Sequence, residues 1–305
     1  MSSARALGAL VLTGVLALAS ACGGDDGKAD AKGQSVVVTA ANGAVRVPAA
    51  PKRIVSLSPT HTETLFAIGA GPQVVAADEY SNYPANAPRT KLSGFKPNVE
   101  AITKYNPDLV VVSDDINGIV KALEKVKVPV LLEPAAKKID DVYDEIGDLG
   151  LATGRSGAAA KLTATMRAEI QKTVAAAPKK NLTYYHELDD QLHTVTSSTF
   201  IGQVYGLFGL RNIADPADKT RSGYPQLSRE ALLTSDPDLV FLADTKCCAQ
   251  SAAQVAKRPG WSRLTAVRAG GVVALDDDVA SRWGPRLPQF AATIGAAVGK
   301  VAAGK

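Results

Sequence analysis

The chain has 305 residues, 46% hydrophobic and 21% charged, so it can build one large or two medium domains, and a disordered or fibrous chain is excluded. Its 34 basic and 30 acidic residues give a net charge of +4 without a dense basic run, so no nucleic-acid partner is expected. Three cysteines are too few for a disulfide scaffold.

The N-terminus has the pattern of an export signal. Residues 7–21 are uncharged and mostly apolar, shorter than the about 20 residues that span a membrane, and they end in small residues. Cys22 follows directly, as in a bacterial lipobox, although Ala19 stands where that pattern usually has Leu. We predict a signal peptide over 1–21, lipidation of Cys22 and a flexible polar tether over 22–34. The chain is then exported and lipid-anchored to the outer face of the cytoplasmic membrane; an ordinary cleaved signal is the alternative.

The body alternates apolar, β-branched runs with helical patterns, which predicts an α/β fold with open sheets. Because the strands are continuously apolar, we expect sheets buried on both faces. The first half has predicted strands at 53–57, 73–77, 108–113 and 128–132, and helices near 60–69, 98–105 and 116–126. The second half has predicted strands at 182–187, 238–243 and 272–275, and helices at 200–208, 228–234 and 286–302.

A long stretch between these halves shows almost no strand character. Apolar residues recur at four-residue spacing from Leu162 to Ile170, which predicts a long helix ended by a following proline. We therefore predict an N-terminal α/β lobe over 35–137, one bridging helix over 138–178 and a C-terminal α/β lobe over 179–305.

An internal repeat supports two similar lobes. The sequence EAITKYNPDLVVVSD from Glu100 and EALLTSDPDLVFLAD from Glu230 are identical at seven of fifteen positions. Each copy reads as a short helix, an Asn-Pro or Asp-Pro turn, and a buried strand. Generic α/β sequence is the alternative, but the Glu-Ala pair in register upstream favours a true repeat.

Motifs of catalysis are missing from the sequence. It has no G-x-S-x-G elbow, no phosphate-binding loop and no H-E-x-x-H pair. His61, His186 and His193 lack metal-ligand spacing, so we expect no directly bound metal and no intrinsic cofactor. A two-lobed chain without catalytic residues indicates a cleft that binds a ligand, and not an enzyme.

Several motifs resemble the iron-chelate and cobalamin class of ABC-importer substrate-binding proteins. These motifs are SPTHTETLFAIG from Ser58, YSNYP from Tyr80, GYPQLSREALLTSDPDLVF from Gly223 and DVASRWGPRLPQF from Asp278. The resemblance implies two α/β lobes joined by one rigid helix, a ligand held between them and delivery to an ABC permease. We expect cobalamin as the ligand of a monomeric receptor, with a ferric siderophore or haem as the alternatives.

The predicted ligand residues come from both lobes. Tyr80 and Tyr83 lie in a loop after a strand, and their flat rings suit the edge of a large macrocycle. The resemblance adds Tyr224 in the second lobe, with Asp278 and Arg282 four residues apart. Arg286 resembles a structural residue, and Trp283, in a loop, is predicted to form a cleft wall.

The start of the helix after Ser58 has two possible roles. Ser58 or Thr60 can cap it, with Glu63 completing a capping box. Alternatively, the helix N-terminus binds an anionic group of the ligand.

The two copies of the repeat each begin with a glutamate. The resemblance implies that Glu100 and Glu230 bind arginines on the two permease subunits. The alternative is that each glutamate only stabilises its helix through the helix dipole.

Cys247 and Cys248 are adjacent, with no other partner if Cys22 is lipidated. A strained vicinal disulfide, free thiols, a soft-metal site and simple packing are the alternatives. A less favoured function is a surface redox or thiol protein that uses this pair.

Overall fold

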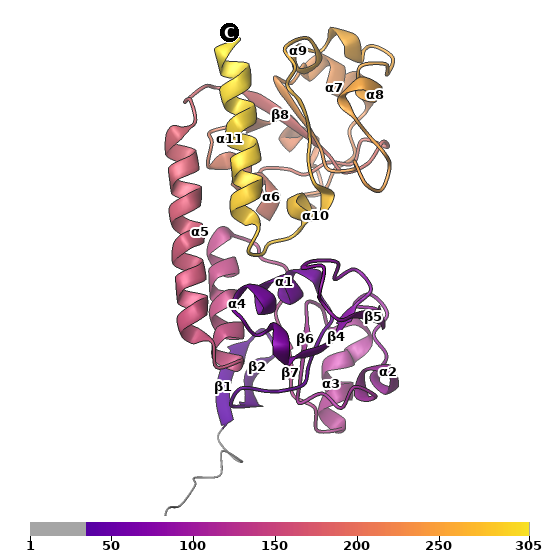
Figure 1. The fold of residues 1–305 in the computed structure, drawn as a ribbon. Helices are drawn as coiled ribbons and strands as arrows, with labels where there is room; N and C mark the ends of the chain where they lie inside the picture. The colour runs from indigo at the N-terminus through magenta and orange to yellow at the C-terminus, as the bar shows by residue number, and fades with distance from the viewer. Residues whose placement is uncertain (1–34, 305) are drawn as a thin grey trace, which may run out of the picture. The chain divides into compact units, whose positions relative to one another are not determined.

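The computed structural model describes residues 35–304, which form two parallel sheets surrounded by helices and one short hairpin (Figure 1). The predicted signal peptide, lipidation at Cys22 and the tether over 22–34 lie outside the described residues. Within residues 35–304, no helix is both long enough and apolar enough to cross a membrane.

The predicted α/β architecture is confirmed, and most strands lie within two residues of their predicted ends. The first sheet has the order β5-β4-β3-β6-β7 and the second β11-β10-β8-β9, both parallel. The first sheet comprises β3 (Ile54–Ser56), β4 (Val74–Asp78), β5 (Arg89–Leu92), β6 (Leu109–Val112) and β7 (Val130–Leu132). The second comprises β8 (Thr183–Glu187), β9 (Arg211–Asn212), β10 (Leu239–Leu242) and β11 (Val272–Ala274). We call the parts built on them the N-terminal and C-terminal lobes.

Helices cover both sheets. Those of the N-terminal lobe are α1 (Pro59–Ala67), α2 (Val99–Thr103) and α3 (Ile119–Lys125). Those after β8 are α6 (Phe200–Gly206), α7 (Arg229–Ser235), α8 (Ala252–Val255), α9 (Thr265–Arg268), α10 (Asp277–Ser281) and α11 (Leu287–Ala303). The short helices α8, α9 and α10 were not predicted, because four or five residues carry too little periodicity to be recognised.

The predicted bridging segment, 138–178, contains two helices and not one. They are α4 (Ile139–Ala152) and α5 (Ser156–Ala176). Gly154 lies between them at φ +69°, its N–H bonds to the carbonyl of Leu151, and the next N–H bonds back to that of Gly150 at 2.7 Å. This glycine-dependent cap ends α4. The predicted helix from Leu162 to Ile170 is α5, which alone has 21 residues.

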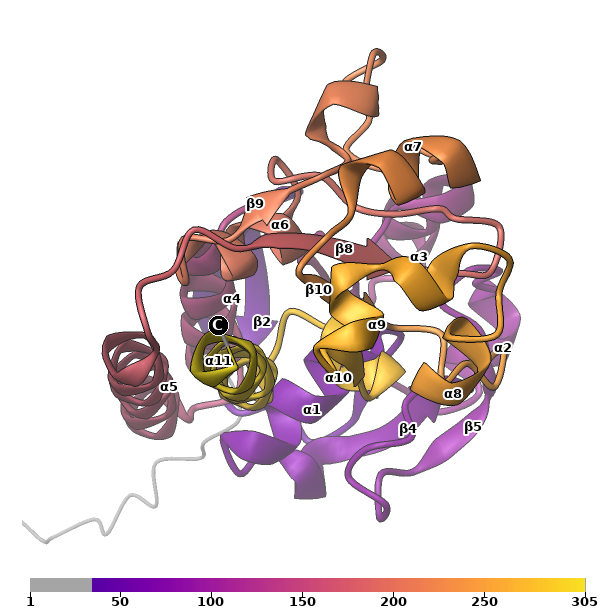
Figure 2. The same cartoon turned by 90° about the horizontal axis from the view of Figure 1, so that it is seen from above.

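The helices α4 and α5 connect the lobes differently. α4 packs against α1 and against the hairpin strand β1 (Ser35–Ala40), whereas α5 packs against α11 of the C-terminal lobe. Seen from above, α4, α5 and α11 stand together beside the sheets (Figure 2). A helix pair therefore joins the two lobes.

The internal repeat occupies equivalent places in the two sheets. β6 lies between β3 and β7, and β10 lies between β8 and β11. Asp108, just before β6, accepts hydrogen bonds from the N–H groups of Lys52 and Arg53 at 2.8 Å each. Asp238, just before β10, accepts one from the N–H of Thr183 at 2.9 Å. Each aspartate thus ties its strand to the start of the neighbouring strand, so the repeat encodes the same pairing twice.

One apolar core continues through both lobes. Successive residues of a strand point to opposite faces of the sheet. One face of each sheet joins a shared core with α4, α5 and α11, and the other face forms a core private to its lobe. The shared core includes Ile54, Leu109, Ile146, Met166, Tyr184, Phe241 and Phe290. Burial on both faces explains the continuously apolar strands.

The N-terminal hairpin was not predicted. It pairs β1 with β2 (Gly43–Pro48) around a turn at Ala41 and Asn42. The Asn-Gly step at Asn42 was its sequence signal, since such steps favour tight hairpins, and Gly43 has φ +98°. The N–H of Ala41 bonds to the carbonyl of Leu132 at 3.0 Å, which docks the hairpin on β7.

Candidate functional site

Buried polar side chains hold the loop after β4 in place. Ser81 is 1% exposed and donates a hydrogen bond to Asp78, while its hydroxyl lies 2.8 Å from that of Thr62 on α1. Burial raises the pKa of Asp78, and this effect outweighs the hydrogen bond from Ser81, which lowers that pKa. With Ser81 turned inward, Tyr80 and Tyr83 remain 54% and 47% exposed. The loop therefore presents both predicted tyrosines to solvent at the carboxyl end of the sheet.

A third exposed aromatic residue, Phe95, belongs to this surface and was not predicted. It is 68% exposed, and its ring meets that of Tyr80 edge-on with centroids 5.7 Å apart. Gly94 lets its loop approach Leu57, because a Cβ there would lie 2.4 Å from the Leu57 carbonyl oxygen. An aromatic residue in an otherwise polar loop was its only sequence signal. We call Tyr80, Tyr83 and Phe95 the aromatic cluster.

Tyr224 lies on the C-terminal lobe and is 54% exposed. Its loop pairs with the segment that follows β8: the N–H of Thr196 bonds to the Gly223 carbonyl at 2.8 Å, and that of Thr194 to the Pro225 carbonyl at 3.0 Å. Gly223 has φ +82°, a conformation that favours glycine. Tyr224 is thus held near the carboxyl end of the second sheet, and its contact with ligand stays a prediction.

Polar contacts link the carboxyl ends of the two sheets through α10. Lys246, which follows β10, places its Nζ 2.7 Å from Oδ2 of Asp278, and Asn82, which follows β4, donates to the same oxygen at 3.0 Å. Burial would raise the pKa of Asp278, but the bonds from Lys246 and Asn82 and the charge of Arg282 outweigh it and lower that pKa. Asp278 is therefore charged at neutral pH.

Glu63 is the centre of the lobe junction. Its side chain is 2% exposed, and Oε1 accepts a hydrogen bond from Arg282 Nη1 at 2.7 Å while Oε2 accepts one from Arg286 Nε at 2.7 Å. Such charge-assisted bonds are the strong ones. The predicted capping box is wrong, because Glu63 is committed to the arginines and the Ser58 side chain, at the N-cap of α1, makes no capping bond. Anion binding by this helix start lacks support, since Thr60 is 3% exposed.

Arg282 also fixes the loop of the aromatic cluster. Besides Glu63, it donates to the carbonyl of Tyr80 at 3.1 Å, to Oδ1 of Asn82 at 2.9 Å and to Oδ1 of Asp278 at 2.8 Å. Arg286 lies over the ring of Tyr83, 4.5 Å from its centroid. Arg282 and Asp278 thus hold the aromatic loop in place, and their direct contact with ligand stays a prediction.

Trp283 docks on the N-terminal lobe. It lies in a loop, as predicted, and its Nε1 donates to Oε2 of Glu145 on α4 at 3.0 Å. Its ring stands edge-on to His61, with centroids 6.5 Å apart. Gly284 follows closely against Thr60, where a Cβ would lie 3.3 Å from a methyl group. The structure places Trp283 in the lobe junction, and its role as a cleft wall stays a prediction.

A group of acidic residues, of which Glu133 and Glu145 are buried, lies near the carboxylate that accepts from Trp283. Glu133, just after β7, is 4% exposed, and burial together with the charges of Asp148 and Glu145 raises its pKa to about 8. Burial and the charges of Asp144 and Glu145 raise the pKa of Asp148 to about 6. Glu133 is therefore protonated at neutral pH.

Cys247 and Cys248, the cysteines of the described residues, are free and exposed. The vicinal disulfide is thus not formed in the structure, and the packing alternative is wrong. A side-chain interaction with Cys248 that favours the protonated thiol, with burial and nearby carboxylates, raises the pKa of Cys247 to about 12. Thiol exchange needs the thiolate, so this environment does not favour a redox protein.

Glu100 and Glu230 occupy matching positions. Each is the second residue of its helix, α2 or α7, and each is exposed. Both helices have a side-chain cap at the N-terminus. The Asn98 side chain accepts a hydrogen bond from the N–H of Ala101 at 2.9 Å, and the Ser228 hydroxyl accepts one from the backbone N–H three residues later at 3.0 Å. The two carboxylates thus project from equivalent elements of the lobes.

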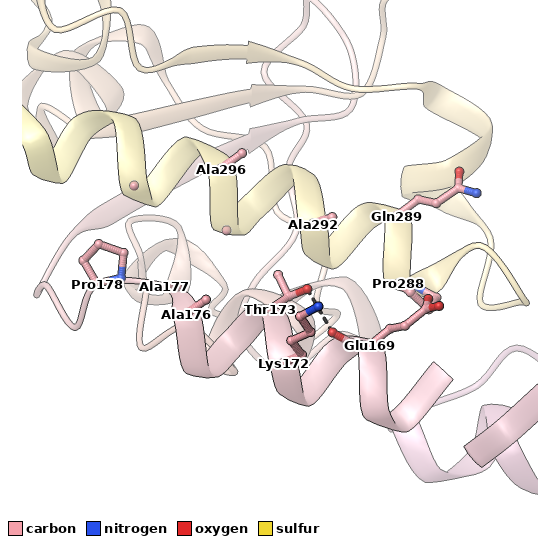
Figure 3. Close-up of a pocket in the computed structure, with 12 residues that line it drawn as sticks. Glu169, Lys172, Thr173, Ala176, Ala177, Pro178, Pro288, Gln289, Ala292 and Ala296 are labelled. Atoms are coloured by element: carbon pink, nitrogen blue, oxygen red, sulfur yellow. Dashed lines mark hydrogen bonds between the residues drawn. The ribbon is translucent and has the colours of Figure 1, made fainter. Parts of the chain in front are cut away.

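A groove of about 580 Å³ lies elsewhere, between α5 and α11 (Figure 3). Its walls are mainly small residues of the two helices, with Glu169, Lys172 and Gln289 at the rim. It contains no predicted ligand residue and lies away from the carboxyl ends of the strands. The candidate site is therefore the aromatic cluster with the lobe junction beneath it.

Comparison with known proteins identifies the family. The periplasmic binding protein family matches residues 54–279. The chain belongs to this family. Its members are solute receptors without enzymatic activity, in agreement with the predicted binding function.

Individual relatives and structures extend the match. A cobalamin-binding protein of Halobacterium salinarum is 33% identical, covering 81% of this chain and 69% of its own. The vitamin B12-binding protein BtuF of Vibrio cholerae superposes with a TM-score of 0.68 at 24% identity, over 82% of this chain and 98% of its own. The haem-binding protein RhuT of Roseiflexus superposes with a TM-score of 0.71 at 24% identity, over 82% of this chain and 99% of its own. At these identities the two structures establish the shared fold.

Replacing Glu63 with Gln tests the lobe junction. The substitution leaves two mostly buried guanidinium groups without their shared carboxylate, so the free energy of unfolding should fall by about 3–5 kcal/mol. Urea denaturation followed by circular dichroism measures it. Asp140→Asn, which breaks an exposed ion pair with Arg167, is the control and should cost less than about 1 kcal/mol. Equal effects of the two variants would contradict the central role of Glu63.

The raised pKa of Glu133 predicts a pH-dependent stability. Between the unfolded pKa near 4.5 and the folded pKa of about 8, the folded chain holds one proton more than the unfolded chain. Stability therefore falls as pH rises through this window, by up to about 1.4 kcal/mol per pH unit. Glu133→Gln should flatten that slope in urea titrations from pH 5 to 8.5. Glu124→Gln, on the exposed face of α3, controls for loss of charge; parallel curves for all three proteins would refute the assignment.

Proposed function

We propose that the chain is an extracytoplasmic substrate-binding lipoprotein of an ABC importer that captures cobalamin and delivers it to the permease. The aromatic cluster carries this proposal. Three exposed rings at the carboxyl end of a parallel sheet offer a stacking surface where open α/β folds bind ligands. The cobalamin-binding relative, 33% identical, favours a corrinoid. Lipidation of Cys22 would hold the receptor on the outer face of the cytoplasmic membrane.

The junction beneath the cluster explains how a flat ligand would be held. Arg282 bonds the carbonyl of Tyr80, and Arg286 lies over the ring of Tyr83, so both rings are positioned before ligand arrives. Pre-organised groups lose little entropy on binding. Tyr224 faces the ligand from the second lobe in this proposal, with the side chains of Asp278 and Trp283 at its edges.

Haem is the second candidate. Tyrosine hydroxyls can ligate haem iron, and Tyr80, Tyr83 and Tyr224 are all about half exposed. A haem site would need one of these hydroxyls, whereas stacking on cobalamin needs only the ring. This difference separates the two ligands experimentally.

Variants of Tyr80 test both candidates. Calorimetric titration with cyanocobalamin, haem and a ferric siderophore should give the highest affinity for cyanocobalamin. Tyr80→Ala should weaken it by about 1–3 kcal/mol, roughly 5- to 150-fold, because stacking area is lost. Tyr80→Phe keeps the ring and should bind cyanocobalamin normally. Val126→Ala, an exposed apolar residue at the end of α3, is the control. If the protein bound haem most tightly and Tyr80→Phe abolished that binding, haem would replace cobalamin as the proposed ligand.

Delivery is proposed to use Glu100 and Glu230. Two separated carboxylates on equivalent helices can orient the receptor on a permease that carries complementary arginines. Glu100→Gln combined with Glu230→Gln should preserve folding and ligand affinity but lower uptake on the order of tenfold or more. Uptake into cells and stimulation of transporter ATPase measure it. The matched control, Glu124→Gln with Glu169→Gln, removes two other exposed carboxylates. Unchanged uptake, or lost ligand affinity, would refute docking.

A further inference from the structure

The loop after β4 carries one side chain that reaches across to the other lobe. Asn82 stands between Tyr80 and Tyr83 in the sequence. Its Nδ2 donates to Oδ2 of Asp278 at 3.0 Å, and its Oδ1 accepts from Nη1 of Arg282 at 2.9 Å. Arg282 also donates to Asp278 directly, at 2.8 Å. Three side chains from two lobes thus form a closed set of hydrogen bonds.

The carboxamide of asparagine suits this position chemically. The charged carboxylate of Asp278 only accepts hydrogen bonds, whereas the guanidinium of Arg282 only donates them. An amide does both, because its oxygen accepts and its nitrogen donates. A carboxyl group at position 82 could still accept from Arg282. It could donate to Asp278 only while it carried a proton.

The C-terminal side of this set is held in place by its own lobe. Oδ1 of Asp276 accepts from the N–H groups of Asp278 at 3.0 Å and Val279 at 3.2 Å, which caps α10. Lys246, from the loop after β10, places its Nζ 2.8 Å from Asp276 and 2.7 Å from Asp278. Asn82 therefore docks the loop of the N-terminal lobe on an acceptor that other contacts already fix.

Two neighbouring residues anchor this loop in different directions. Ser81 is buried and hydrogen-bonds to side chains of its own lobe, whereas Asn82 bonds to the other lobe. On either side of this pair, Tyr80 and Tyr83 are 54% and 47% exposed. The two rings thus flank the point where the loop is tied to the C-terminal lobe.

We propose that Asn82 is a positioning residue of the ligand site. Through Asp278 and Arg282 it holds the loop, and with it the rings of Tyr80 and Tyr83, in the conformation that binds ligand. If the loop is in place in only a fraction of the molecules, the apparent affinity falls by that fraction. The inference rests on the proposed function for the identity of the ligand, but the ordering of the loop does not depend on it.

Hydrogen–deuterium exchange of the ligand-free protein tests the ordering. Asn82→Ala should speed exchange of the loop amides on the order of tenfold. These include the N–H of residue 82 itself, which bonds to the Tyr80 carbonyl at 2.8 Å. Exchange of the core strands should not change. Asn86→Ala is the matched control, because Asn86 is exposed in the same loop and its side chain makes no hydrogen bond within residues 35–304.

Stopped-flow binding of cyanocobalamin tests the consequence for the site. Asn82→Ala should lower the affinity on the order of tenfold through slower association, since fewer molecules have the loop in place. Asn82→Asp should bind progressively more weakly as the pH rises from about 4.5 to 8, because the introduced carboxyl loses the proton that it donates to Asp278. A purely structural role of Asn82 would not produce this pH profile. The parent and Asn86→Ala should not show this loss.

Opposite results would overturn the proposal. Exchange in Asn82→Ala as slow as in the parent would mean that Asn82 does not order the loop. Faster exchange with unchanged affinity would mean that the ordering does not serve the ligand, and tighter binding would mean that Asn82 competes with the ligand for Asp278 and Arg282. If the parent does not bind cyanocobalamin, the proposed function fails, whereas the exchange rates still decide whether Asn82 positions the loop.

Discussion

Glu63 enters the lobe junction from α1 as a carboxylate that is almost fully buried. Removing such a group from water costs several kcal/mol, and only good hydrogen-bond geometry offsets that cost. Arg286 supplies it on both carboxylate oxygens, and Arg282 adds a second bond to Oε1. The same arginines hold the Tyr80 carbonyl and cover the Tyr83 ring. One buried ionic interaction between the lobes therefore also helps to place Tyr80 and Tyr83.

Glu133 shows the other solution to burying an acid. Within residues 35–304 it has no cationic partner of the kind that Glu63 has, and burial raises its pKa to about 8, so it remains neutral at physiological pH. Near it, the neutral indole N–H of Trp283 donates a hydrogen bond to the carboxylate of Glu145. The junction thus holds one buried acid between two arginines, and a second buried acid lies among other carboxylates that raise its pKa.

The shared core limits how far the lobes can separate. Side chains of both sheets pack against α4, α5 and α11 in one continuous apolar cluster. Opening the lobes widely would expose part of this core to water, which costs about 25 cal/mol for each Å² of apolar surface. Wide separation of the lobes is therefore disfavoured. In the proposed function this suits binding on a preformed surface, because the junction contacts Tyr80 and Tyr83 without any ligand.

The sequence by itself determined the sheets, the repeat and the family resemblance. Continuous apolar strands, a helical period and the paired NPDL and DPDL turns are local signals, and each is read from a few neighbouring residues. The tyrosines were also predicted, because a motif after a strand fixes their place in the chain. The break at Gly154 and the hairpin at Asn42 were local too, but a single glycine or turn step is a weak signal.

Only the tertiary structure decided what Glu63, Arg282 and Phe95 do. Glu63 and Arg282 are 219 residues apart in the chain. A capping box and an ion pair would both use the carboxylate of Glu63, and the choice between them depends on whether a distant arginine reaches the helix. Phe95 lies next to Tyr80 because the loops after β4 and β5 are neighbours in space. Contacts between remote segments leave no periodic trace in sequence, so they follow from packing alone.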